Sequence, residues 1–245
     1  MSEQSGTLHA SALSRAYAGV RALDGVSIAV PRHEVVGLIG PNGAGKSTLV
    51  NLLSGFDFPT VGSVELDGVD ITRWPAHRRV RAGLVRTFQH GHAFPALTAR
   101  ENVQVAALGT GASARAARAR AGELLDLLGL GDHADVNASA LAHGDERLLG
   151  VARALATEPK FVLLDEPAAG LNEEEIGAFA DTIRLVRDER RAGVLLIDHN
   201  VPLVLGVCDR IHVLDQGITL AEGTPAEIRS HPAVTEAYLG GSAAA

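Results

Sequence analysis

The sequence predicts an α/β fold in which helices cover both faces of a parallel sheet. Apolar runs at residues 35–39, 161–164 and 194–197 have the length of fully buried strands, and segments with helical spacing separate them. Polar residues follow each run directly, at the strand ends where such sheets bind ligands. The chain has 245 residues, 46% of them hydrophobic, and can bury a substantial core. We therefore expect a single domain over residues 1–245.

The order of the elements follows from local patterns. Residues 7–36 predict two strands around a turn at 18–20, and residues 62–68 predict a hairpin. The basic run at 75–82 predicts a short helix, whose arginines we expect on a solvated face. A helical texture from about 90 to 159 predicts an insertion that ends in a helix from Arg147 to Leu155. Residues 7–88 and 160–240 are then expected to form the core, which strands at 211–214 and 218–221 close.

A glycine-rich stretch between the first buried strand and an amphipathic helix carries the main chemical signal. It fits G-x-x-x-x-G-K-[ST], the phosphate-cradling loop of nucleotide triphosphatases. Its glycines permit backbone N–H groups to converge on phosphate oxygens, and the helix adds its positive dipole end. We expect the lysine to reach the β- and γ-phosphates and the serine hydroxyl to hold Mg²⁺. The stretch consists of Gly40, Pro41, Asn42, Gly43, Ala44, Gly45, Lys46, Ser47 and Thr48.

Two carboxylates end the buried run at 161–164. Asp165 is expected to bind Mg²⁺ through the water shell of the ion, and Glu166 to polarise the attacking water. Two adjacent carboxylates repel one another unless a metal or hydrogen-bond donors lie beside them. Asp-Glu-Pro alone also fits a plain helix start, so the assignment depends on the loop at 40–48.

Composition narrows the class of partner. The net charge of −7 and the absence of an arginine and aromatic cluster disfavour a nucleic-acid partner. The single cysteine, Cys208, is expected to be a small buried residue, in keeping with a reducing compartment. The N-terminus lacks a secretory signal, and no apolar run approaches the ~20 residues of a membrane span. We expect a cytoplasmic protein that works at a membrane only through partners.

As a set, these motifs resemble the ATP-binding cassette ATPases of membrane transporters, from about residue 7 to 240. The resemblance implies the cassette fold, with an N-terminal antiparallel β subdomain and a helical insertion around the P-loop core. It implies ATP and Mg²⁺ as cofactors, Gln89 as a sensor of Mg²⁺ and of the permease, and His199 as the switch histidine. It also implies that Tyr17 stacks on adenine, where a buried strand tyrosine is the alternative. Two such subunits face head to tail, each ATP lying between one subunit's loop and the other's signature.

The signature segment departs from the common family form Leu-Ser-Gly-Gly-Gln. It reads Leu141-Ala142-His143-Gly144-Asp145, so Ala142 lacks the hydroxyl that would donate to the partner's γ-phosphate, and Asp145 places a negative charge near phosphate. Ala142, His143 and Gly144 remain the expected nucleotide contacts, through backbone donors and the helix dipole. Asn172 likewise stands where the family has aspartate. A weak signature beside a complete nucleotide loop favours a heteromeric ATPase dimer, with a homodimer as the alternative.

The departures, with the tail at 232–240, resemble the branched-chain amino-acid importer subfamily. That resemblance implies permease partners and, indirectly, an external solute-binding protein. Three alternatives remain: the ATPase of a lipopolysaccharide-type exporter, a soluble cassette ATPase acting on nucleic acid or ribosomes, and a binding-only cassette that hydrolyses ATP poorly. Glu166 and His199 argue against the last.

Overall fold

Two sheets organise the chain. The computed structural model describes residues 6–88 and 93–236. Four strands form an antiparallel sheet in the order β2-β1-β4-β5, and six form a second sheet in the order β10-β9-β3-β8-β7-β6. The strands are β1 (Thr7–Tyr17), β2 (Val20–Pro31), β3 (Val35–Ile39), β4 (Val61–Leu66), β5 (Val69–Asp70), β6 (Leu84–Arg86), β7 (Phe161–Asp165), β8 (Gly193–Ile197), β9 (Arg210–Asp215) and β10 (Ile218–Gly223).

The six-stranded sheet is parallel except at one edge. Strands β9, β3, β8, β7 and β6 run in one direction, with Val36 opposite Leu195 and Leu195 opposite Leu163. Strand β10 returns antiparallel to β9. The cause is local: Gln216 and Gly217 both have positive φ, which is the conformation of a tight hairpin turn, and such a turn leaves no room for a crossover. The expected parallel sheet is confirmed for five strands, and the sixth makes it mixed.

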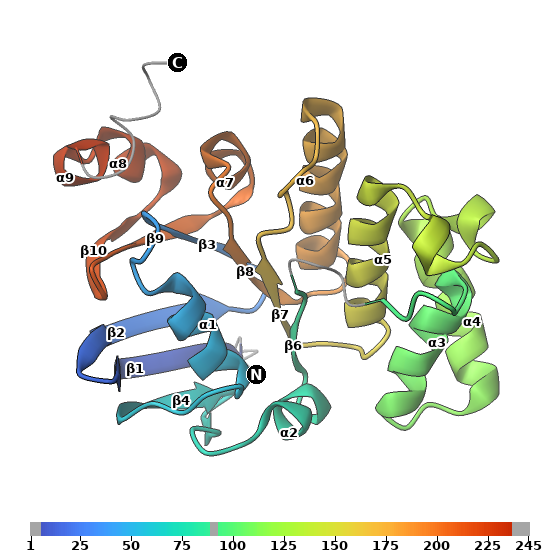
Figure 1. Cartoon of the computed structure of the whole chain (residues 1–245), viewed down its shortest axis with the longest axis horizontal. Helices are drawn as coiled ribbons and strands as arrows, with labels where there is room; N and C mark the ends of the chain where they lie inside the picture. The colour runs from blue at the N-terminus through green and yellow to red at the C-terminus, as the bar shows by residue number, and fades with distance from the viewer. Residues whose placement is uncertain (1–5, 89–92, 237–245) are drawn as a thin grey trace, which may run out of the picture.

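Helices lie on both faces of this sheet. Helix α1 is enclosed between the two sheets, and α3 to α7 lie on the other side of the six-stranded sheet (Figure 1). The α-helices are α1 (Lys46–Ser54), α2 (Ala76–Arg81), α3 (Ala99–Gly109), α4 (Ala114–Leu127), α5 (His143–Leu155), α6 (Glu173–Asp188), α7 (Val201–Val207), α8 (Pro225–Ser230) and α9 (Pro232–Val234), with short 3₁₀ turns η1 (Gly131–His133) and η2 (Ala138–Ala140).

The alternation of side chains along the strands divides the core in two. In β3, Val36 and Leu38 face α1 and the antiparallel sheet, whereas Val35 and Ile39 face the larger group of helices. Because every residue of β3 is buried, its sequence is a continuous apolar run and not an alternation of apolar and polar residues. The glycine-rich loop leaves this strand at its carboxyl end, at the boundary between the two clusters.

The basic helix α2 differs from its prediction. We expected its arginines in solvent, but the side chain of Arg79 is fully buried. Its guanidinium donates to the carbonyl oxygens of Leu52 and Leu53, at 2.7 Å each, and to those of Thr72 and Trp74. Burial lowers the pKa of Arg79 to about 10, which still leaves it protonated at neutral pH. Arg79 thus places a positive charge at the negative end of the α1 dipole.

Candidate nucleotide site

The glycine-rich loop begins where β3 ends and passes directly into α1. At Gly40, φ is 149° and a Cβ would lie 2.1 Å from the carbonyl oxygen of Leu214. At Gly45, φ is 103° and a Cβ would lie 2.6 Å from the carbonyl oxygen of Ala22. Neither position accepts a side chain, because both the backbone angle and the neighbouring carbonyl forbid one. The resulting turn presents the first turn of α1, whose N-cap Gly45 supplies no side-chain acceptor, to the outside.

Lys46 folds back across this loop. Its Nζ donates to the carbonyl oxygens of Gly40 at 2.6 Å and Pro41 at 2.9 Å. Burial lowers the pKa of Lys46, and the negative charge of Glu166 opposes that shift. The loop that carries Lys46 follows β3 and Glu166 follows β7, and both parallel strands pair with β8, so the two residues lie at the same edge of the sheet. Ser47, on the same turn, is exposed.

Asp165 ends β7 and is held by an arginine from the neighbouring strand. Its Oδ2 accepts from a terminal nitrogen of Arg86 at 2.7 Å, and the other terminal nitrogen of that guanidinium donates to Oδ1 of Asn51 on α1 at 2.7 Å. The two side chains are only 10% and 16% exposed. Arg86 was not among the predicted site residues. The sequence does indicate it in one respect, because Arg86 is a basic residue at the end of the apolar strand β6, which pairs with β7. The guanidinium supplies the donor that two adjacent carboxylates need.

Glu166 adopts a backbone conformation that is uncommon for a non-glycine residue, with φ of 47°. Its N–H donates to the carbonyl oxygen of Ile197, the last residue of β8. The next residue, Asp198, is buried and accepts from the N–H of Ala168 at 3.0 Å and of Asn200 at 2.8 Å. Asp198, which was not predicted as a site residue, thus joins the loop after Glu166 to the loop carrying His199. His199 itself is exposed at this edge.

Tyr17 lies at the end of β1 and is 42% exposed, so the alternative of a buried strand tyrosine is wrong. Its hydroxyl donates to Oδ2 of Asp57 at 2.5 Å. The guanidinium of Arg15 lies 4.9 Å from the ring centroid and covers one face. This arrangement fixes the orientation of the ring.

The signature segment forms part of a helix. We expected a helix only from Arg147, but α5 begins at His143, with Ala142 as an N-cap that forms no side-chain hydrogen bond. Oδ2 of Asp145 lies 2.8 Å from Nδ1 of His133 in η1, so this carboxylate already has a partner within its own chain. In Figure 1, α5 and α1 lie on opposite sides of β6 and β7. The signature is therefore not brought to the loop of its own chain.

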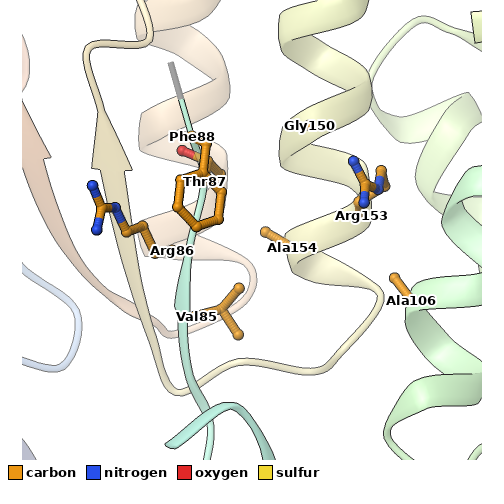
Figure 2. Close-up of a pocket in the computed structure, with 8 residues that line it drawn as sticks. All are labelled: Val85, Arg86, Thr87, Phe88, Ala106, Gly150, Arg153 and Ala154. Carbon is orange, nitrogen blue, oxygen red and sulfur yellow. The ribbon is translucent and has the colours of Figure 1, made fainter. Parts of the chain in front are cut away.

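A cavity of about 170 Å³ lies beside the strand that leads to Gln89. Gln89 itself is outside the described residues. Figure 2 shows the ring of Phe88 over the strand with Arg86 beside it, and Gly150, Arg153 and Ala154 on α5 across from them. The guanidinium of Arg86 lies 4.9 Å from the ring centroid of Phe88. The cavity also contacts α3 through Ala106 and α5 through Gly150, Arg153 and Ala154. It thus lies where the core sheet meets the helical segment.

Comparisons with known proteins establish the family of the chain. The family model "ABC transporter" matches residues 23–169, and the model "Branched-chain amino acid ATP-binding cassette transporter" matches residues 219–244. The chain belongs to the ABC transporter family. It is 43% identical to the branched-chain amino acid transport ATP-binding protein LivG of Salmonella typhimurium, covering 91% of this chain and 94% of the relative. It is 42% identical to BraF of Pseudomonas aeruginosa, covering 95% and 97%.

Solved structures show the same cassette fold. The ADP conformation of the ATP-binding cassette MJ1267 superposes with a TM-score of 0.87 at 30% identity, covering 96% of this chain and 99% of that one. The chain is thus an ABC transporter ATPase of the branched-chain amino acid subfamily. No helix in the described ranges 6–88 and 93–236 is both long and apolar enough to cross a membrane.

Proposed function

We propose that this ABC ATPase powers the import of branched-chain amino acids through permease partners, by binding and hydrolysing ATP with Mg²⁺. The observation that carries the chemistry is the approach of two chain segments. The phosphate loop follows β3 and Glu166 follows β7, and both of these parallel strands pair with β8, so Lys46 and Glu166 lie at the same edge of the sheet. A γ-phosphate held by the lysine would therefore lie near the carboxylate. Subfamily membership supports the class of solute.

The side chains fit a magnesium nucleotide. The hydroxyl of Ser47 and the carboxylate of Asp165 are hard oxygen donors, which Mg²⁺ prefers, and we add Gln89 to this set. Among the described residues, no group of three or more His, Cys, Asp and Glu side chains could hold a metal alone. Phosphate oxygens and water would complete the shell of the ion, which would neutralise charge that develops on the phosphates. Arg86 holds Oδ2 of Asp165 and so fixes the orientation of this donor.

Three further side chains have roles around the bound nucleotide. Glu166 polarises the attacking water, and exposed His199 reaches the γ-phosphate from the adjoining loop. Tyr17 stacks on adenine with the ring face that Arg15 does not cover. Gly40 to Thr48 cradle the phosphates through their backbone N–H groups.

The separation of the signature from the phosphate loop of its own chain indicates that a second ATPase subunit is needed. Ala142, His143 and Gly144 lie apart from the loop of their own chain, so we assign them to the nucleotide of a second ATPase subunit. Because Ala142 offers no hydroxyl, we propose that this second subunit is a different chain with a full signature. We place the permease contact at the cavity beside Phe88, the residue that precedes Gln89 in the sequence. The ring of Phe88 lies 5.4 Å from the exposed ring of Phe56. An external binding protein would act only through the permeases, and the chain itself would lie on the cytoplasmic face.

We also propose a division of the chain into a nucleotide-binding core and a helical subdomain. We assign residues 7–88 and 160–240 to the nucleotide-binding core and about 90–159 to a helical subdomain that carries the signature. No nucleic-acid partner is proposed.

Reconstitution tests the assignment. The chain should co-purify with its permeases from detergent-solubilised membranes, and the complex should hydrolyse ATP faster when the binding protein carries leucine. In proteoliposomes, leucine uptake should require ATP and should be lost with Lys46→Ala. Stimulation by lipopolysaccharide instead of leucine would support the exporter alternative, and co-purification with ribosomes instead of permeases would support the soluble one.

A further inference from the structure

The loop between β7 and α6 is held from two sides by consecutive residues. On one side, the N–H of Ala168 donates to the buried carboxylate of Asp198, next to His199. On the other side, the carbonyl oxygen of Ala169 accepts from Arg147 at 3.2 Å and lies 3.2 Å from Nε2 of His143. Both of these side chains come from the first turns of α5. The loop therefore links the signature helix to the switch loop within one chain.

The same loop is bonded to the main chain of Glu166. The N–H of Ala169 donates to the carbonyl oxygen of Glu166 at 3.3 Å. One residue, Ala169, thus bonds through its N–H to Glu166 and through its carbonyl to α5. Only two hydrogen bonds separate the side chain of His143 from the backbone that carries the carboxylate of Glu166.

The fit between His143 and this loop is close. Gly170 has φ of 81°, and a Cβ at this position would lie 2.8 Å from Nε2 of His143. Arg147 follows His143 by one helical turn, and its guanidinium lies 3.4 Å from the imidazole. A glycine at position 143, as in the common signature form, has no side chain and cannot make this contact. The histidine is therefore a distinct feature of this chain's signature.

We propose that His143 is a positioning residue for Glu166. By fixing the carbonyl of Ala169, it holds the loop that sets where the carboxylate of Glu166 lies. The signature helix thereby controls the general base of its own chain, in addition to any contact across a dimer. This inference rests on the proposed role of Glu166. Such control matters because a displacement of about 1 Å at a reacting group can cost up to about 10²-fold in rate.

The test compares His143→Ala with His143→Gln in the assembled transporter, with His77→Ala as a control because His77 is exposed on α2. The partner ATPase carries Glu→Gln at its own general base, so that only this chain's site hydrolyses ATP. The alanine variant should lower kcat roughly three- to tenfold, the range expected for one lost hydrogen bond. Its KM for ATP should not change, because the contact lies outside the phosphate loop. Glutamine, which carries an amide donor, should restore most of the loss.

A second pair of variants approaches the same contact from the loop. Gly170→Ala should lower kcat more in the parent, where the new Cβ meets His143, than in His143→Ala, where only the backbone strain remains. Additive effects would contradict the contact, and so would unchanged turnover in His143→Ala. If the loss occurs only at the partner's site, in complexes with Glu166→Gln in this chain, His143 acts across the interface and the inference is wrong. An inactive parent complex would instead overturn the proposed function, and this inference with it.

Discussion

Arg86 ties together three parts of the nucleotide site. Its guanidinium bonds to Asp165 at the end of β7 and to Asn51 on α1, and it lies 4.9 Å from the ring centroid of Phe88. Because the Arg86 and Asp165 side chains are largely shielded from water, their charges depend on each other. The residue is thus both a support for the metal-binding carboxylate and a bridge to the strand end before Gln89.

Arg86→Met should lower the free energy of unfolding by about 3 kcal/mol, because it leaves the Asp165 carboxylate without its cationic partner. Urea denaturation of the purified chain measures this loss. Arg21→Met is the control, since Arg21 and its partner Asp24 are both exposed, and it should cost less than about 1 kcal/mol. Equal small losses for the two variants would show that the Arg86 pair contributes no more than a surface pair.

His212 gives the fold a predictable response to acid. This side chain of β9 is fully buried, with Nε2 3.0 Å from the hydroxyl of Thr219. Burial lowers the pKa of His212 in the folded protein, Glu222 opposes this shift and Arg210 adds to it. In the unfolded chain the pKa is about 6.5. The unfolded protein therefore binds a proton at His212 more readily than the folded protein does. The free energy of unfolding is thus higher while His212 is neutral, and it decreases as the pH falls below about 6.5.

His212→Asn should flatten that response. Between pH 7.5 and 5.5 the parent's free energy of unfolding should fall more steeply than that of the variant, as measured by urea denaturation at each pH. His77→Asn should keep the parent slope, because His77 is exposed. A variant as pH-sensitive as the parent would show that other groups cause the loss.

Helix α6 is capped by Asn172, the residue that stands where the family has aspartate. Asn172 is the N-cap of α6, and its Oδ1 accepts from the N–H of Glu175 at 3.0 Å. The Glu175 side chain accepts in return from the N–H of Asn172 at 2.8 Å. Aspartate and asparagine serve this capping box equally well, so the exchange seen in the sequence leaves the loop after Glu166 anchored.

Asn172→Asp should therefore change the free energy of unfolding by less than about 0.5 kcal/mol, whereas Asn172→Ala should cost about 1 kcal/mol. Thermal unfolding of the three proteins under one buffer condition gives the comparison. If aspartate destabilises as much as alanine, the cap is not what position 172 contributes.

The elements also show which features the sequence can predict. The strands β3, β7 and β8 and the loop at 40–48 were predicted because an apolar run of fixed length, a glycine pattern and a lysine are local signals. The burial of Arg79 was not, because two of its four carbonyl partners, Leu52 and Leu53, lie at the end of α1, which only the tertiary structure brings close to α2. The early start of α5 was missed for a related reason. Ala142 and His143 carry no capping signal that would indicate a helix start.

In the whole molecule, the nucleotide site lies where two packing units meet. Helix α1 packs with the antiparallel sheet, while α5 and α6 pack on the other face of the six-stranded sheet. Asp165 connects the two units through Arg86, which also bonds to Asn51 on α1. The bridging roles of Arg86 and Asp198 could not be derived from the chain order alone, since β6, β7 and β8 come together from distant segments. The predicted residues Lys46, Asp165 and Glu166, by contrast, carry recognisable motifs.

We infer that Glu166 activates the water that attacks a γ-phosphate held by the loop at 40–48. The most direct test is single-site turnover of the assembled transporter with Glu166→Gln, together with ATP affinity measured by calorimetry. We predict a loss of ~10²–10⁴ in kcat, about 3–5 kcal/mol, with ATP affinity retained, because the amide removes the base and leaves the loop intact. Lys46→Ala, measured in parallel, should weaken ATP binding itself. Turnover of Glu166→Gln within a few-fold of the parent would show that Glu166 is not the general base.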